Sequence, residues 1–146
     1  MSLSKLTIVI PTFYPGKIIK KCLASLPLNS EIIIIDNGED PELEKIIKLQ
    51  KNKIKYYKVG DVGLPKSFNI ALKKSKNENI LITQPDVCFE KDSITNLIKA
   101  QKKYSKAGIV SPLLFEKKKY SQYDYLDLHL SKLGKLKNTR RPKRIS

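Results

Sequence analysis

Asn79-Ile80-Leu81-Ile82-Thr83-Gln84-Pro85-Asp86-Val87 is the stretch from which we predict the fold. Its apolar run predicts a central strand that is covered on both faces, and Pro85 prevents the strand from continuing. Asp86 then follows the carboxyl end of this strand, the edge at which ligands bind in open α/β sheets. A carboxylate there suggests a metal–phosphate group and hence a nucleotide site. A Pro-Asp sequence is also a common turn and helix cap, so the stretch alone leaves both interpretations open.

Strand-like and helix-like segments alternate along the chain on both sides of this stretch. Strands are expected at 6–10, 32–35, 53–59, 79–82 and 108–112, the first of them stopped by Pro11. Helices are expected at 17–26, 40–50, 64–72 and 91–104. This alternation over the first 115 residues predicts an α/β fold, with a mostly parallel sheet between two layers of helices and right-handed crossovers.

Composition narrows the class of protein. A length of 146 residues with 40% hydrophobic content suits one compact domain. The formal net charge of +15 would suit nucleic acid, an anionic membrane surface or a phosphorylated substrate, but lysines spread over many helices are also typical of a merely soluble surface.

Cellular location is predicted from the cysteines and the apolar segments. Cys22 and Cys88 have no metal-ligand spacing, which favours free thiols in a reducing, cytoplasmic setting. The run from Leu6 to Ile10 is too short for a signal sequence, and no run is long enough to span a membrane. Any membrane contact is therefore expected to be peripheral, at the inner face.

Polar side chains follow the predicted strands and should meet at one edge of a parallel sheet. They are Thr12, Asp36, Gln84 and Asp86. Asp36 could accept a hydrogen bond from a ribose hydroxyl or a base N–H, although Asp36-Asn37-Gly38 could also be only a turn. Gly63 and the helix that follows it offer backbone N–H groups to an anion, and Lys66 could add charge there or be ordinary surface.

Four motifs in order resemble the signatures of family-2 glycosyltransferases with the GT-A fold, in particular rhamnosyltransferase-like members. These motifs are Leu6-Thr7-Ile8-Val9-Ile10-Pro11-Thr12-Phe13, Ile32-Ile33-Ile34-Ile35-Asp36-Asn37-Gly38, Asp61-Val62-Gly63 with Asn69, and Ile80-Leu81-Ile82-Thr83-Gln84-Pro85-Asp86-Val87. The resemblance covers roughly residues 5–115. It implies transfer of a sugar from a nucleotide diphosphate sugar to an acceptor such as a glycan, a lipid or a cell-surface polysaccharide precursor, with inversion and a divalent metal.

The resemblance also assigns roles to residues. Pro11, Thr12 and Phe13 would line the nucleotide pocket, and Asp36 would bind the base. Gly63, Lys66 and Asn69 lie in the segment that would pack around the nucleotide and donor. Gln84 and Asp86 occupy the place of the family's Asp-x-Asp motif, and Asp86 would bind Mg²⁺ or Mn²⁺ together with the diphosphate.

The sequence departs from the family pattern in two respects. Gln84 is a poorer cation ligand than the usual acid, and Asp61 and Phe68 replace the residues that are common at their positions. The family's catalytic base lies well downstream of the metal motif, but the last acids here, Asp124 and Asp127, match no motif and suit a helix surface better. The catalytic base is therefore unassigned.

The chain after Phe115 differs in character from the part before it. We expect residues 1–115 to form the nucleotide-sugar-binding core, 116–137 a short partial acceptor-side segment with an amphipathic helix at 126–136, and 138–146 a disordered basic tail.

Two other functions remain open. A non-catalytic nucleotide-binding or scaffold protein could dock on anionic lipid or a partner protein through Arg140-Arg141-Pro142-Lys143-Arg144. Binding of nucleic acid is the weaker alternative, because the sequence lacks the interleaved aromatic and basic residues of single-strand binders.

Overall fold

The structure is a computed structural model of the 146-residue chain. It describes residues 5–112, 115–116, 119–120, 128–130 and 136–138. The chain divides into two compact units, Met1–Tyr104 and Ser105–Ser146, and each is described here by itself.

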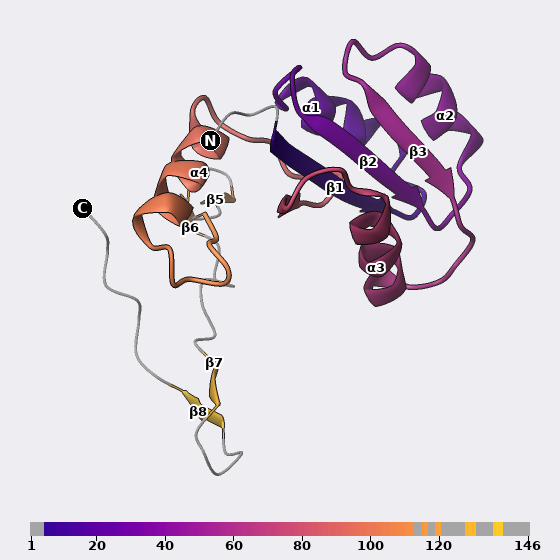
Figure 1. Ribbon diagram of the computed structural model, residues 1–146. Coiled ribbons are helices and arrows are strands. Elements are labelled where there is room, and N and C mark those ends of the chain that lie inside the picture. The colour runs from indigo at the N-terminus through magenta and orange to yellow at the C-terminus, as the bar shows by residue number, and fades with distance from the viewer. Residues whose placement is uncertain (1–4, 113–114, 117–118, 121–127, 131–135, 139–146) are drawn as a thin grey trace. The chain divides into compact units, whose positions relative to one another are not determined.

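A four-stranded parallel sheet forms the centre of the first unit (Figure 1). Its strands are β1 (Leu6–Thr12), β2 (Glu31–Asp36), β3 (Ile54–Lys58) and β4 (Asn79–Ile82), in the order β3-β2-β1-β4. The register places Thr12 opposite Asp36 and Asp36 opposite Lys58, so these three strands end level with one another. The predicted parallel α/β sheet is confirmed.

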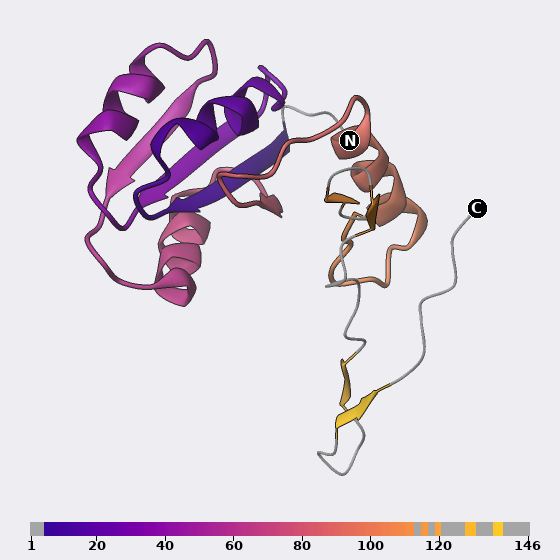
Figure 2. The ribbon, with the colours of Figure 1, turned by 180° about the vertical axis from the view of Figure 1, so that it is seen from behind.

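Helices cover both faces of this sheet, as Figures 1 and 2 show from opposite sides. They are α1 (Ile19–Ala24), α2 (Pro41–Lys48), α3 (Leu64–Lys74) and α4 (Ser93–Lys103), and a 3-10 turn at Gly16–Ile18 precedes α1. Buried side chains of α1, α2 and α4 form one core with the sheet, and α3 forms the other. The predicted three-layer arrangement is therefore confirmed.

The side-chain alternation of the strands explains the two cores. Ile8 and Ile10 of β1 face the core of α1 and α2, whereas Val9 faces α3. Every residue from Ile32 to Ile35 in β2 has 0% of its surface exposed, as expected for a strand with helices on both faces. Asp40 caps α2 by accepting a hydrogen bond from the Glu42 N–H at 2.8 Å.

The prediction that Pro11 ends the first strand is wrong, because β1 continues through Pro11 to Thr12. The Val9 carbonyl accepts from the Thr83 N–H at 3.0 Å, so the backbone of Val9 and, two residues on, that of Pro11 face β4. Because β4 ends at Ile82, it has no residue opposite Pro11 that would need an N–H donor. Pro11, which lacks an N–H, therefore fits in β1 without breaking a hydrogen bond of the sheet.

The prediction that the strand at 79–82 is central is wrong. This strand, β4, lies at an edge of the described sheet. Its only described partner is β1, and Ile82 is 47% exposed. A continuous apolar run cannot distinguish these two positions, because an edge strand also contributes side chains to both cores.

The prediction of a fifth strand at 108–112 is also wrong. The described residues there form no strand, and Ile109 is 90% exposed. Only three residues separate Gly108 from Pro112, which leaves few backbone groups for a ladder.

The second unit contains two short antiparallel pairs among its described residues. β5 (Phe115–Glu116) pairs with β6 (Lys119–Tyr120), and β7 (Leu128–Leu130) pairs with β8 (Leu136–Asn138). The predicted helix at 126–136 is therefore wrong at residues 128–130 and 136. The predicted disordered tail is wrong at Asn138, which ends β8, and its residues 139–146 lie outside the described residues.

In the described part of the chain, every helix is too short or too polar to cross a bilayer.

A hydrogen-bond network joins the strands where the sheet begins, which we call its amino edge. The Glu31 carboxylate accepts from the Thr7 hydroxyl at 2.5 Å and from the Lys76 N–H at 3.0 Å, and it pairs with the Lys55 ammonium. Burial alone would raise the pKa of Glu31, but the hydrogen bonds from Lys55, Lys76 and Thr7 outweigh it and lower the pKa. The network ties β1, β2 and β3 to the end of α3.

We expect Glu31→Gln to lower the free energy of unfolding at pH 7 by about 1–2 kcal/mol. The pKa of Glu31 is lower in the folded protein, so its charge stabilises the fold above the unfolded pKa of about 4.3 and this contribution is lost as pH falls through the folded pKa. Urea unfolding at pH 7 and pH 3 should show the difference shrinking in acid. Glu78→Gln, at an exposed acid of the same edge, is the control. A penalty that is independent of pH would contradict the assignment.

Candidate functional site

A hollow of about 280 Å³ lies at the carboxyl edge of the sheet, where the loops after β1, β2, β3 and β4 meet. Its lining residues are Pro11, Thr12, Phe13, Asn37, Asp61, Gly63, Leu64, Gln84 and Pro85. These residues are distant in sequence and converge because all four strands run in one direction.

The structure brings five of the predicted site residues together around this hollow: Pro11, Thr12, Phe13, Gly63 and Gln84. Asp36 is buried next to Thr12 and does not line the hollow. Lys66, Asn69 and Asp86 are exposed and do not line it either. The ligand roles assigned to all nine residues stay predictions.

The Asp36 carboxylate is fully buried and is held by four donors within the protein. Its Oδ1 accepts from the Gly38 N–H at 3.1 Å and from the Thr12 hydroxyl at 3.3 Å. Its Oδ2 accepts from the Asp40 N–H at 2.8 Å and from the Tyr56 hydroxyl at 2.5 Å. Burial and the hydrogen bond to Asp36 raise the pKa of Tyr56, which therefore remains a donor at neutral pH. Asp36 joins β1, β3 and the β2–α2 loop.

Asn37, the next residue, links the hollow to α3. Its side-chain amide donates to the Thr12 carbonyl at 3.2 Å, and its Oδ1 lies 2.9 Å from the Ser67 hydroxyl. The single hydroxyl hydrogen of Ser67 is shared with the Gly63 carbonyl, also at 2.9 Å. Oδ1 of Asn37 therefore retains acceptor capacity at the wall of the hollow.

Two exposed aromatic rings follow β1, and the first of them, Phe13, lines the hollow. Phe13 and Tyr14 are 61% and 62% exposed and contact each other edge to face at 5.0 Å. A Cβ on Gly38 would lie 2.9 Å from the Tyr14 ring and 3.0 Å from its backbone N, so only glycine admits this close approach. The loops after β1 and β2 are thereby packed together.

The start of α3 forms another wall. Gly63 has φ of +75°, a conformation that favours glycine, and it directs the chain into the helix. The first N–H groups of a helix have no partner within it, and here they belong to Leu64 and Lys66, because Pro65 has none. This end of the helix carries partial positive charge.

The segment that carries Gln84 and Asp86 is fastened to α1 at two points. The Cys22 thiol donates to the Gln84 carbonyl at 3.6 Å, and the Ser25 hydroxyl accepts from the Phe89 N–H at 3.0 Å. Burial, with smaller contributions from Cys88 and Asp86, raises the pKa of Cys22 to about 12. Cys22 is thus a neutral structural thiol.

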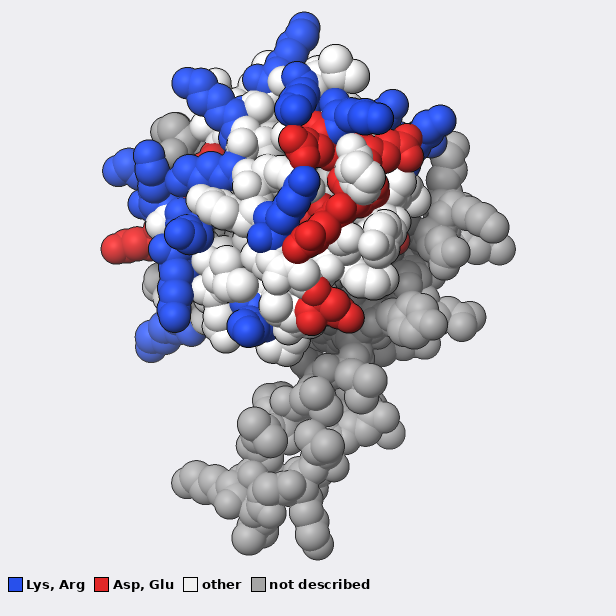
Figure 3. All heavy atoms as spheres, turned by 90° about the vertical axis from the view of Figure 1, so that its right-hand side faces the viewer, with Lys and Arg blue, Asp and Glu red and all other residues white. Residues whose placement is uncertain are grey.

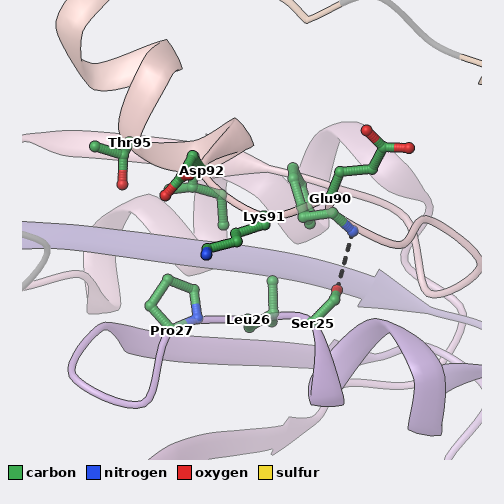
Figure 4. Close-up of a pocket in the computed structure, with 9 residues that line it drawn as sticks. Ser25, Leu26, Pro27, Glu90, Lys91, Asp92 and Thr95 are labelled. Atoms are coloured by element: carbon green, nitrogen blue, oxygen red, sulfur yellow. Dashed lines mark hydrogen bonds between the residues drawn. The ribbon is translucent and has the colours of Figure 1, made fainter.

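The second contact of this segment borders another hollow, of about 170 Å³ (Figure 4). It is lined by Ser25, Leu26, Pro27, Phe89, Glu90, Lys91, Asp92, Ile94 and Thr95. The Glu90 carboxylate points away from it. The hollow contains none of the predicted site residues, and it lies at the connection from α1 to β2, at the amino edge of the sheet.

The side chains near the carboxyl edge suit a metal ion that is held jointly by the protein and a phosphate ligand better than a metal ion held by protein side chains alone. Among the described residues, no three His, Cys, Asp or Glu side chains cluster as a metal site. Asp61 and Gln84 line the hollow and Asp86 is exposed two residues beyond Gln84. One or two carboxylates are the protein ligands of a Mg²⁺ that is held largely by phosphates and water.

Charge is unevenly distributed around the site. The acids of the carboxyl-edge loops and the first turn of α2 include Glu39, Asp40, Glu42 and Asp61. Acidic side chains gather in the middle of the face drawn in Figure 3, and lysines lie around them. Lysine and arginine are absent from the residues that line the 280 Å³ hollow.

The predicted site residues do not include Asn37, Asp61 and Pro85, which line the hollow, whereas Leu64 lies in the predicted segment from Gly63 to Asn69. The signal for Asn37 was present in strand alternation: Asp36 continues the face of Ile32 and Ile34, which pack against α2, so the next residue turns toward α3. For Asp61 no such signal exists, because it lies in a loop.

The fold and the hollow together define an open α/β domain with a ligand site at the carboxyl edge of its sheet. The sequence profile of Glycosyl transferase family 2 matches residues 7–145, and the chain belongs to this family. A comparison with the curated proteins found no match.

Among solved structures, the chain is similar to the crystal structure of S. aureus TarS, with 23% identity and a TM-score of 0.59, over 69% of this chain and 20% of that one. TarS 1-349 in complex with UDP-GlcNAc gives 22% identity, a TM-score of 0.58 and coverage of 69% and 32%. TarS 1-349 in complex with UDP gives 23% identity and a TM-score of 0.59, over 69% of this chain and 33% of that one. The chain therefore spans a third or less of these TarS chains. At such identity the likeness shows the shared fold, and the predicted GT-A fold is confirmed.

We expect Asp36→Asn to lower the free energy of unfolding by roughly 2–4 kcal/mol, because an amide cannot accept from all four donors and leaves at least one buried N–H or O–H unpaired. Asp61→Asn, at an exposed acid, should change it by less than about 0.5 kcal/mol. Urea unfolding of both variants makes the comparison. Equal stabilities would refute the structural role of Asp36.

Proposed function

We propose that this chain is a glycosyltransferase that binds a nucleoside diphosphate sugar in the carboxyl-edge hollow and transfers the sugar, with inversion, to an acceptor. The observation that carries the proposal is the convergence of the four family motifs on that hollow in a chain of glycosyl transferase family 2. The TarS structures with UDP-GlcNAc and UDP support a donor of this chemical class.

We assign recognition of the base or ribose to Asp61 and Asn37 rather than to Asp36. The Asp36 carboxylate is saturated by protein donors and is 0% exposed. Asp61 is exposed and lines the hollow, and a carboxylate accepts strongly from neutral N–H and O–H groups. This assignment replaces the role that the family resemblance gives to Asp36.

A thermal-shift panel of UDP, dTDP and GDP with Mn²⁺ tests this assignment. At a concentration of 100 times its Kd, the matching nucleotide should stabilise the protein by about 2.7 kcal/mol. Asp61→Asn should weaken its affinity roughly tenfold to a hundredfold through the lost charged hydrogen bond, with the unfolding temperature of the free protein unchanged. Glu39→Gln, at an exposed acid of a neighbouring loop, is the control. Equal affinity of the Asp61 variant and the unmodified chain would assign recognition elsewhere.

We also propose that Mg²⁺ or Mn²⁺ accompanies the donor, held mainly by the diphosphate with Asp86 as the protein carboxylate and Gln84 nearby. The lining of the hollow contains Asp61 and no basic residue, so a diphosphate placed there lacks a counter-charge from the lining. A bound divalent cation would supply this counter-charge and stabilise the leaving diphosphate.

Nucleotide affinity with and without the metal tests the role of Asp86. The matching nucleoside diphosphate should bind more tightly with Mn²⁺ than with EDTA, and Asp86→Asn should reduce this difference. Glu90→Gln, at an exposed acid on the same segment, should preserve it. Binding that is equally tight in EDTA would exclude a metal-assisted site.

Donor and acceptor identity are part of the same proposal. The rhamnosyltransferase-like motif at Gln84 makes dTDP-deoxyhexoses the first donors to assay, and a glycan, lipid or polysaccharide precursor is the expected acceptor. Asp124 and Asp127 lie outside the described residues, and the catalytic base stays unassigned. The free thiols of Cys22 and Cys88 suit a cytoplasmic enzyme. Nucleotide binding without hydrolysis or transfer would support the non-catalytic alternative.

A further inference from the structure

The amino edge of the sheet, opposite the hollow, is rich in lysine. Because the strands are parallel, α1, α2 and α3 all end at this edge and the connections to β2, β3 and β4 all lie there. We define the amino-edge surface by its nine lysines: Lys5, Lys21, Lys48, Lys51, Lys53, Lys55, Lys73, Lys74 and Lys76. Its acids are Glu31, which is bonded to Lys55, Glu44, which pairs with Lys48 at 3.2 Å, and Glu78. The 170 Å³ hollow at the same edge adds Glu90 and Asp92 beside Lys91. Lysines outnumber these acids, so the surface carries a net positive charge.

Direct contacts join lysines of β3 to lysines at the end of α3. Lys55 of β3 donates to the backbone carbonyl of Lys74 at 3.4 Å and also pairs with Glu31. The Lys76 N–H donates to the same carboxylate at 3.0 Å, and the Lys74 ammonium lies 5.5 Å from the centre of the Tyr57 ring. The start of β3 and the end of α3 are therefore adjacent.

Three leucines are exposed on the same surface, one in each connection region. Leu49 at the end of α2 is 80% exposed, Leu28 before β2 is 59% exposed, and Leu72 in the last turn of α3 is 48% exposed. Single exposed leucines are ordinary. Their occurrence at one lysine-rich edge is the composition of a surface that binds a bilayer interface, where apolar side chains insert beside basic ones.

Lysines in the last turns of α1, α2 and α3 also complement the helix dipoles, which would explain them without any partner. That explanation does not extend to Lys5, Lys51, Lys53 and Lys76, which lie outside the helices. It does not explain the leucines either.

We propose that the amino-edge surface docks the protein on an anionic lipid bilayer, so that the carboxyl-edge hollow opens away from the lipid toward soluble ligands. A bilayer fits better than nucleic acid because this surface contains no arginine and its most exposed apolar side chains are leucines. Nucleic-acid surfaces use arginine forks and stacked aromatic rings. Lysine, a hydrated point charge, suits a layer of lipid phosphates.

Vesicle co-sedimentation of the full chain tests the proposal. The unmodified protein should bind vesicles of phosphatidylcholine with 30% phosphatidylglycerol at 0.1 M NaCl, and it should bind neither pure phosphatidylcholine vesicles nor, at 0.5 M NaCl, the anionic ones. The triple variant K53Q/K74Q/K76Q should lose roughly fivefold in partition coefficient for each lysine, about a hundredfold in all. Leu49→Ser should weaken binding at 0.1 M NaCl by several fold.

Two matched variants make the result specific to this surface. K17Q/K20Q/K66Q removes three exposed lysines at the other edge and should bind vesicles within about twofold of the unmodified chain. R140Q/R141Q/R144Q removes the arginines of the tail and should retain most of the binding. Loss of binding in the tail variant alone, or equal losses in the two lysine triples, would overturn the proposal.

Nucleic acid is tested in the same assay series. A fluorescent single-stranded oligonucleotide should bind weakly and should not distinguish the two lysine triples. Tight oligonucleotide binding that K53Q/K74Q/K76Q abolishes, without vesicle binding, would replace the bilayer by nucleic acid. Because no sugar nucleotide is used, the result is independent of the proposed transferase activity.

Discussion

The buried carboxylate of Asp36 is the interaction on which the candidate site depends. It stands at the last position of β2 and receives hydrogen bonds from β1, β3 and the loop before α2. A buried charge is tolerated only when donors surround it, and here each donor comes from a segment that must be placed for the hollow to exist. The side chain therefore builds the site without facing it.

Parallel strand direction gives the two ends of the domain different charge. Strands β1 to β4 all end at the edge with the hollow, and the connections from α1, α2 and α3 to the next strand lie at the opposite edge. The acids Asp36, Asp40 and Asp61 lie at the first edge, and the nine lysines of the amino-edge surface lie at the second. The helix dipoles favour this separation, since α2 begins with Glu42 and Glu44 and ends with Lys45 and Lys48. A domain that is polarised in this way can bind a ligand at one end and a surface at the other.

The sequence was sufficient for the layers of the fold but not for the limits of the sheet. Apolar runs such as Ile32–Ile35 predicted buried strands because burial on both faces requires them. Whether a strand lies at the centre or at an edge depends on pairing, which a run like that of β4 does not encode. Pro11 shows the same limit. A proline ends a strand only where the neighbouring strand needs its N–H, and β4, the neighbour on that side of β1, ends before it reaches Pro11.

The position of the site could be predicted more closely than the residues that face it. Four motifs pointed to the edge that contains the hollow, because parallel topology places their loops together. Strand alternation decides which of Asp36 and Asn37 lines the hollow. Asp36 lies on the α2 side with Ile34 and is buried, whereas Asn37 turns to Ser67 on α3 and lines the hollow. Beyond the strand, alternation no longer applies, and Asp61 reaches the hollow through a loop between Gly60 and Gly63, both at positive φ. Asp61 is exposed there, whereas the loop after β2 turns the Gly38 and Asp40 N–H groups onto Asp36, and an exposed carboxylate is what a ligand-binding residue needs.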